Sequence, residues 1–266
     1  MVSKMKLSIS NIAWNTEDNQ RVYEYLSKKG FTGIEIAPTK LFPESPYDHI
    51  EEAVEYFAKL KDSYGLEVSS MQSIWYGQLG NIFESENDRI ALQSYTFKAI
   101  DFASAIGCKN LVFGNPKARN KGESHTDDEV FGFFKSISDY AHNKNTCIAL
   151  EPNPEIYGTD FINFTKQAFD FCKKSGCEKL RVNVDFGTII YNNETLEWLQ
   201  KDLALVNHIH ISEPYLKKIE KRELHNSLTA LEQLGYDKYV SIEMGLQNTI
   251  TDVFDVIDYI YEVFKK

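Results

Sequence analysis

The sequence predicts a single (β/α)8 TIM barrel that spans residues 1–266 as one domain. The main observation is an alternation along the chain. A short run rich in apolar and β-forming residues is followed by a longer, charged segment with helical periodicity, and this pair recurs eight times. A second observation is that no linker or break in composition divides the chain. Uninterrupted strand-helix units in this number are typical of an α/β barrel.

The predicted strands are short and spread along the whole chain. They cover residues 7–14, 33–38, 67–73, 110–116, 147–153, 180–186, 206–213 and 239–244. Helices are predicted between them, among others at residues 88–106, 127–143 and 161–175, the last ending before Gly176, as helices often do. A doubly wound open sheet is the alternative fold, but no GxGxxG or GxxxxGK(S/T) motif follows an early strand to bind a nucleotide.

The composition narrows the classes of partner. The chain has 29 Lys and Arg against 39 Asp and Glu, a net charge of -10, which disfavours nucleic acid as a partner. No apolar run approaches the roughly 20 residues of a membrane span, and the N-terminus lacks the apolar region of a signal peptide. We therefore expect a cytoplasmic protein that binds no membrane. Its four cysteines form no CxxC pair, so we expect reduced, mostly buried thiols. A homo-oligomer is left open.

The stretch "VNHIHISEP" carries the first functional signal. Successive side chains of a strand point to opposite faces, so His208, His210 and Ser212 share one face, and Ile209 and Ile211 take the other. In a barrel the apolar face packs against the helices. We therefore expect the two histidines to point into the lumen.

The same alternation recurs in "CIALEPN", "LRVNVDF" and "YVSIEM". It puts Glu151, Asp185 and Glu243 in the lumen-facing phase, each towards the C-terminal end of its strand. Active sites of such barrels are built at that end. The sequence therefore predicts that these three carboxylates and His210 meet at one place.

Three carboxylates in a partly buried site repel one another, and an unpaired buried charge costs several kcal/mol. A divalent cation resolves the conflict. Three oxygen ligands and one imidazole suit Mn²⁺ best, with Mg²⁺, Co²⁺ and Zn²⁺ as alternatives. The competing interpretation is that the four residues are paired with Arg181, Asn183 and lumen water, or lie in exposed loops.

With these residues the chain resembles the xylose isomerase-like barrels, which include sugar phosphate isomerases and epimerases, ketose 3-epimerases and endonuclease IV-type repair nucleases. In ketose 3-epimerases a Glu, an Asp, a His and a Glu that end strands five to eight hold one metal. Glu151 in "ALEPN", Asp185 in "VNVDFG", His210 in "HIHISE" and Glu243 in "SIEMG" match that order. The resemblance implies that all four are metal ligands and that the two glutamates are catalytic, carrying protons between the faces of a bound sugar. Glu35 in "GIEI" matches a carboxylate that many members place near the substrate.

Two departures from the family limit what the resemblance implies. Ketose 3-epimerases have a substrate-contacting His three residues after the strand-six Asp, where this chain has Thr188, and their downstream substrate Arg is missing here. Their sugar preference is therefore not transferred. The repair nucleases hold three zinc ions through extra histidines on earlier strands, and the first four predicted strands contain none.

Further residues at the predicted lumen edge are candidates for binding substrate. Trp75 follows the third strand and offers a flat apolar face to a sugar, or else caps the core. Lys117 and Arg119 follow the fourth strand, where they would hold a phosphate or carboxylate, or form a solvated loop. Asn153 shares the lumen-facing phase. His208 lies deeper, so a buried role among polar groups competes with substrate contact.

The function that fits is a metal-dependent sugar or sugar-phosphate isomerase or epimerase. It would act by proton transfer next to a carbonyl, through an enediolate. Two alternatives stay open: a non-catalytic sugar-binding barrel with a structural metal, and a lyase or dehydratase that uses the same enediolate. The expected partner is a small sugar or sugar phosphate.

Overall fold

The computed structural model describes residues 5–265 and confirms the predicted barrel. The described strands are β1 (Lys6–Ile9), β2 (Gly33–Ile36), β3 (Glu67–Met71), β4 (Leu111–Phe113), β5 (Ile148–Leu150), β6 (Leu180–Asp185), β7 (Val206–Ser212) and β8 (Tyr239–Glu243). They form one parallel sheet in the order β1-β8-β7-β6-β5-β4-β3-β2. Each of them overlaps a strand predicted from the sequence.

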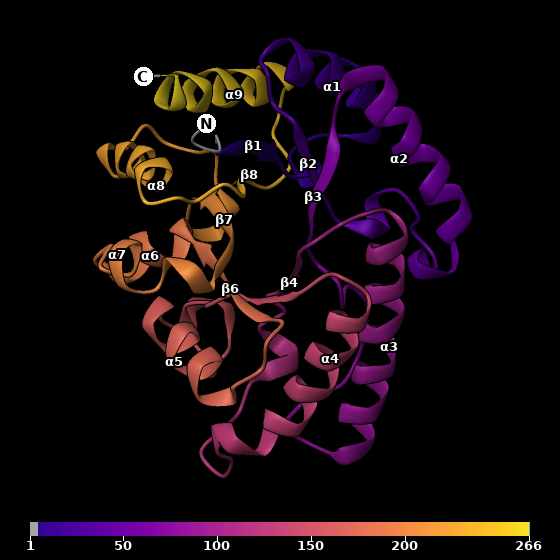
Figure 1. Ribbon diagram of the computed structural model, residues 1–266, viewed down its shortest axis with the longest axis vertical. Coiled ribbons are helices and arrows are strands. Elements are labelled where there is room, and N and C mark those ends of the chain that lie inside the picture. Colours follow the sequence, from indigo (N-terminus) through magenta and orange to yellow (C-terminus); the bar gives the residue numbers. More distant parts are fainter. Residues whose placement is uncertain (1–4, 266) are drawn as a thin grey trace.

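The helices surround this sheet (Figure 1). They are α1 (Asn19–Lys28), α2 (Ile50–Tyr64), α3 (Glu86–Ala105), α4 (Phe131–Asn143), α5 (Thr165–Ser175), α6 (Phe186–Asn192), α7 (Trp198–Lys201), α8 (Ala230–Gln233) and α9 (Ile250–Phe264). In Figure 1, α2 and α3 lie along one side of the strands, and α6 to α8 lie along the opposite side.

The barrel closes through β1. This strand pairs with β8 over its full length, so that Ser8 lies beside Ser241. On its other side, a single bridge between Ser10 and Glu35 links the end of β1 to β2. The ring of strands is therefore nearly complete, and the polar phase of each strand is enclosed within it.

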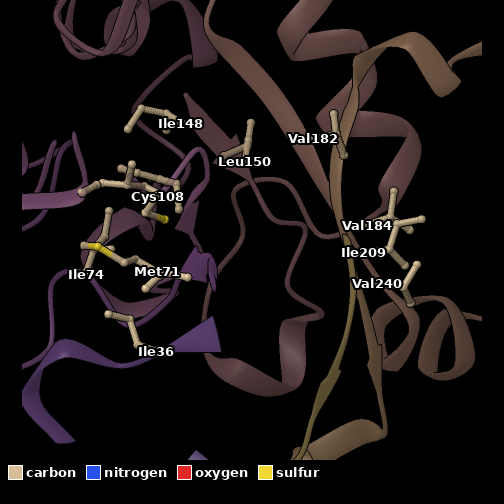
Figure 2. Packing of buried hydrophobic residues seen from close by; sticks show 14 of the residues in the cluster. Ile36, Met71, Ile74, Cys108, Ile148, Leu150, Val182, Val184, Ile209 and Val240 are labelled. Atoms are coloured by element: carbon tan, nitrogen blue, oxygen red, sulfur yellow. The ribbon is translucent and has the colours of Figure 1, made fainter. Parts of the chain in front are cut away.

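The apolar phase of the strands packs outwards under the helices. Figure 2 shows Val182 and Val184 of β6 near Ile209 of β7 and Val240 of β8, and all four are buried. Full burial of an aliphatic side chain of this size contributes roughly 1.5–3 kcal/mol. This layer between sheet and helices supplies the apolar burial that the polar lumen lacks.

One predicted helix starts later than expected. The prediction of a helix from residue 161 is wrong at its start, because α5 begins at Thr165. Ile162 has a left-handed backbone with φ of 59°, and its carbonyl accepts a hydrogen bond from the Asn153 N–H at 3.0 Å. The buried Phe161 belongs to the aromatic packing beneath this turn. Residues 161–164 therefore brace the loop after β5 instead of continuing a helix.

The four cysteines are free and buried, as expected from their spacing. Within residues 5–265, no helix combines the length and apolar character that a membrane crossing requires.

Candidate functional site

A pocket of about 610 Å³ opens at the C-terminal ends of the strands. Glu151 follows β5, while Asp185 and Glu243 end β6 and β8, and all three line the pocket. Each is less than 10% exposed. The structure therefore brings the three predicted carboxylates to one place.

His210 of β7 stands at the centre of this group and is completely buried. Its Nδ1 lies 2.9 Å from Glu151 Oε1 and 3.2 Å from Glu243 Oε2. One donor atom from each of Glu151, Asp185, His210 and Glu243 lies within 4.8 Å of the others. These are the donor types of a site for a hard or borderline divalent cation.

Glu35 of β2 lies beneath His210 on the far side of its ring. Glu35 Oε2 is 2.8 Å from His210 Nε2 and 3.1 Å from His208 Nε2. Because β2 and β7 are not neighbours in the sheet, these contacts cross the lumen. Gln72 also donates to Glu35, at 3.2 Å. A carboxylate that accepts from Nε2 of His210 leaves Nδ1 to face the pocket, and so fixes the orientation of the ring.

Three side chains hold Glu151 in place. Asn183 Nδ2 donates to Glu151 Oε1 at 2.7 Å, and Asn153 Nδ2 lies 3.2 Å from Oε2. The guanidinium of Arg119 donates to the Glu151 carbonyl at 2.7 Å and to Asn153 Oδ1. Pairing with Asn183, one part of the competing interpretation, is thus observed at Glu151.

Asp185 is fixed by its own backbone turn. It is the N-cap of α6, and its Oδ2 accepts the Thr188 N–H at 2.7 Å. The Thr188 hydroxyl lies 2.8 Å from the same oxygen, and Ser212 Oγ donates to Oδ1. Thr188 is completely buried, so at the position of the family's substrate-contacting histidine this chain has a residue that orients Asp185.

The close approach of the charged groups shifts the pKa values of the site residues. Burial, followed by the charge of Glu151, raises the pKa of Asp185 to about 6, although His210 opposes the shift. The pKa of Glu243 is raised to about 7, chiefly by burial. Burial alone would lower the pKa of His210, but Glu243 and Glu35 outweigh it and raise that pKa well above its ordinary value. The two histidines outweigh burial at Glu35 and lower its pKa. Positive charge at the centre is thus strongly favoured.

The predicted substrate contacts divide into two groups. Trp75, Lys117 and Asn153 line the pocket. Trp75 is only 1% exposed, and its Nε1 donates to Thr96 at 2.8 Å, which fixes the indole in the wall. Glu35, Arg119 and His208 do not line the pocket, and each is at most 1% exposed. Their contacts are with residues that form the site.

The two basic residues of the loop after β4, Lys117 and Arg119, have different surroundings. Arg119 lies two residues after Lys117 in a short 3-10 turn, and the two side chains take opposite directions. Lys117 is exposed at the pocket, whereas Arg119 turns inwards beneath Glu151. Burial lowers the pKa of Arg119 to about 10, which still leaves the guanidinium charged at neutral pH.

Gly114, the residue after β4, also shapes the site, although it was not among the residues predicted to do so. A Cβ atom at this position would lie 2.5 Å from Glu151 Oε2. The absence of a side chain therefore leaves space for the carboxylate to reach the pocket. A glycine inside the predicted strand 110–116 was the available signal, because a glycine within a strand often marks a close approach of another group.

Comparison with known proteins agrees with the predicted family. Residues 23–260 match a family model described as a xylose isomerase-like TIM barrel. No curated protein matches the sequence significantly.

Solved structures share the fold at low sequence identity. The apo form of 3-keto-D-glucoside 4-epimerase from E. coli has a TM-score of 0.76 and 19% identity, over 97% of this chain and 100% of that chain. The IolI protein with a zinc atom has a TM-score of 0.73 and 16% identity, over 98% of each chain. D-psicose 3-epimerase with D-tagatose from Clostridium cellulolyticum H10 has a TM-score of 0.69 and 15% identity, over 98% of this chain and 96% of that chain. The family match, supported by this shared fold, shows that the chain belongs to the xylose isomerase-like TIM-barrel family.

Proposed function

We propose that this protein is a divalent-metal-dependent isomerase or epimerase of a sugar, which moves a proton at the carbon next to a carbonyl. The observation that carries the proposal is the convergence of Glu151, Asp185 and Glu243 at the floor of the pocket on the buried His210. One donor atom from each of the four residues lies within 4.8 Å of the others. The names of the similar solved structures support the substrate class, since they include epimerases of a keto-glucoside and of D-psicose.

The donor set fits a divalent cation. His210 Nε2 is engaged by Glu35, so Nδ1 is the nitrogen that faces the carboxylates. Three buried carboxylates around one imidazole carry more negative charge than this imidazole can balance, even when it is protonated. Glu151, Asp185, His210 and Glu243 would hold the ion. Mn²⁺ suits this set best, with Mg²⁺, Co²⁺ and Zn²⁺ as alternatives.

The cation would supply electrostatic stabilisation of the negative charge that develops on the sugar oxygens as the proton leaves carbon. The protein must supply the base. Both oxygens of Asp185 accept hydrogen bonds, from Thr188 and Ser212, which suits a ligand that stays in place. Glu151 and Glu243 approach from β5 and β8, which are separated in the sheet by β6 and β7.

These two glutamates differ in their surroundings. Among the described side chains, only His210 contacts the Glu243 carboxylate within hydrogen-bonding distance, whereas Asn183 and Asn153 hold Glu151. Two bases that reach a sugar from different strands allow one to take the proton and the other to return it. Return on the opposite face inverts the carbon, and return to the adjacent carbon isomerises the sugar.

The non-catalytic alternative drew its support from Thr188 and from the missing downstream substrate arginine. Thr188 donates hydrogen bonds that orient Asp185, a role that a catalytic site can use. No observation favours this alternative over catalysis. A lyase or dehydratase would use the same residues, and product analysis separates it from an isomerase.

A first prediction concerns the metal. Metal-free wild-type protein should bind about one Mn²⁺ per chain in a calorimetric titration. Asp185→Ala and His210→Ala should each weaken binding by more than the roughly 10- to 100-fold that follows loss of an outer partner of a ligand. Asp139→Ala, which removes an exposed carboxylate of α4, is the control and should bind as wild type. Unchanged affinity in both site variants would exclude the metal site.

A second prediction concerns the two glutamates. Glu151→Gln and Glu243→Gln should each lower turnover by about 10²- to 10⁴-fold, the usual contribution of a general base. The measurement is deuterium incorporation from D₂O into a panel of ketoses, aldoses and their phosphates in the presence of Mn²⁺. If the reaction is a two-base epimerisation, one variant should still exchange a substrate proton while failing to invert the carbon.

The control for both glutamates is Glu155→Gln, because Glu155 is exposed in the loop after β5. Turnover at the wild-type rate in both Glu151→Gln and Glu243→Gln would place the bases elsewhere.

A third prediction concerns Gly114. Gly114→Ala should push the Glu151 carboxylate out of position and lower turnover by about 100-fold, since displacement of a reacting group by 1 Å has that order of effect. Its Mn²⁺ affinity should fall as well. Gly132→Ala in α4 is the matched control, because a Cβ there meets no atom within 4 Å. Wild-type turnover and Mn²⁺ affinity in Gly114→Ala would mean that Glu151 does not act from the observed position.

A further inference from the structure

The pocket has two chemically different ends. Its floor is the carboxylate cluster described above. Its outer wall comes mainly from the segment after β3, where Tyr76 and Leu79 line the pocket and are 68% and 91% exposed. Leu216, from the segment after β7, adds a third apolar side chain. Large apolar side chains that are exposed together at the rim of a pocket mark a surface that binds a ligand or partner.

The outer wall is built by a constrained turn. Ser73, Gly77 and Gly80 have left-handed backbones, with φ of 54°, 79° and 103°. The Tyr76 N–H donates to the Ser73 carbonyl at 2.9 Å, and the Gln78 N–H donates to the Trp75 carbonyl at 3.0 Å. The indole of Trp75 is itself fixed by its hydrogen bond to Thr96. These turns hold the backbone so that Tyr76 and Leu79 lie at the pocket.

The pocket is larger than one sugar needs. Pockets of roughly 300–1,000 Å³ enclose drug-sized ligands, which are larger than a monosaccharide. A volume of about 610 Å³ therefore leaves room for a second group beside a sugar that reaches the carboxylates.

The charged residues in the pocket indicate whether the second group is charged or neutral. Among the described residues that line it, Lys117 is the only Lys or Arg, while Glu151, Asp185, Glu213 and Glu243 supply carboxylates. The other cation expected to hold a phosphate, Arg119, is buried and engaged by the Glu151 carbonyl and Asn153. A phosphate normally recruits several donors, among them a bidentate arginine. The pocket favours an uncharged group.

We infer that the outer wall is a subsite for an uncharged ring joined to the reacting sugar through a glycosidic oxygen, so that the substrate is a glycoside rather than a free sugar or a sugar phosphate. This inference rests on the proposed function. The reacting ring must keep a carbonyl, because the proton moves next to one. That carbonyl belongs either to the reducing unit of a disaccharide or to an oxo group on the ring of a glycoside. Tyr76, Leu79 and Leu216 offer apolar faces to the second ring.

The test compares three forms of each ketose in a panel: the free sugar, its 6-phosphate and its 6-O-glucoside. An aryl glycoside with an oxo group on its sugar ring is a further arm, which distinguishes a sugar from an aryl group in the subsite. Deuterium exchange and calorimetric binding are both measured with the Mn²⁺-loaded protein. The glycosylated or aryl form should exceed the free sugar in kcat/KM by about 10-fold or more, the effect of a few apolar contacts. The phosphate should be the poorest.

Variants of the outer wall separate this subsite from the catalytic floor. Tyr76→Ala and Leu79→Ser should raise KM for the glycoside by about 10-fold and leave the free sugar unchanged. Tyr191→Ala and Leu234→Ser are matched controls, because these exposed residues lie outside the pocket lining. The controls should behave as wild type with every form.

Other results would contradict the subsite, the proposed function or both. Preference for the phosphate, or equal kcat/KM for free and glycosylated sugars, overturns the subsite. Variants that dissociate an oligomer in light scattering without changing substrate preference assign the wall to a second copy of the chain, which also overturns it. Glycoside binding that depends on Tyr76 but is followed by no exchange keeps the subsite and overturns the proposed function. Absence of binding by every form overturns both.

Discussion

The structure depends on one electrostatic constraint, the burial of three carboxylates around a single imidazole. Glu151, Asp185 and Glu243 are each removed from water almost completely, and their nearest common partner is His210. Carboxylates in such surroundings are costly unless positive charge lies among them. The direction of the pKa shifts, upwards at Asp185, Glu243 and His210, expresses this demand.

The lumen beneath the cluster is organised to hold the imidazole. Glu35 takes Nε2 of His210 from across the barrel, and Gln72 supports Glu35 from β3's end. With Nε2 held by Glu35, the ring is oriented so that Nδ1 faces the carboxylates. Arg119 acts in a similar way on Glu151, through the backbone carbonyl and through Asn153. The apolar layer between strands and helices offsets the free-energy cost of this polar interior, because its burial stabilises the fold.

The sequence predicted the barrel and the meeting of the four cluster residues, because both follow from periodicity. Alternation fixes which face of a strand a residue takes, and the order of the strands brings their C-terminal ends together. Periodicity does not specify how far along the lumen a side chain reaches. Glu35 therefore looked like a substrate contact, although it lies below His210. The directions of Lys117 and Arg119 depend on a 3-10 turn that no pattern marked. The late start of α5 depends on the left-handed Ile162, which the helical periodicity concealed.

The central claim is that the three carboxylates lie close together because they bind a cation, and that their repulsion lowers the stability of the metal-free protein. The most direct test is the free energy of unfolding of Glu243→Gln and wild type, measured by denaturant titration at pH 8 with a chelator and again with Mn²⁺. Without metal, the variant should be more stable by roughly 1–3 kcal/mol, because it loses one of the mutually repelling charges. Mn²⁺ should stabilise it less than it stabilises wild type, because a ligand is weakened. A metal-free variant that is less stable than wild type, with an undiminished response to Mn²⁺, would contradict the account.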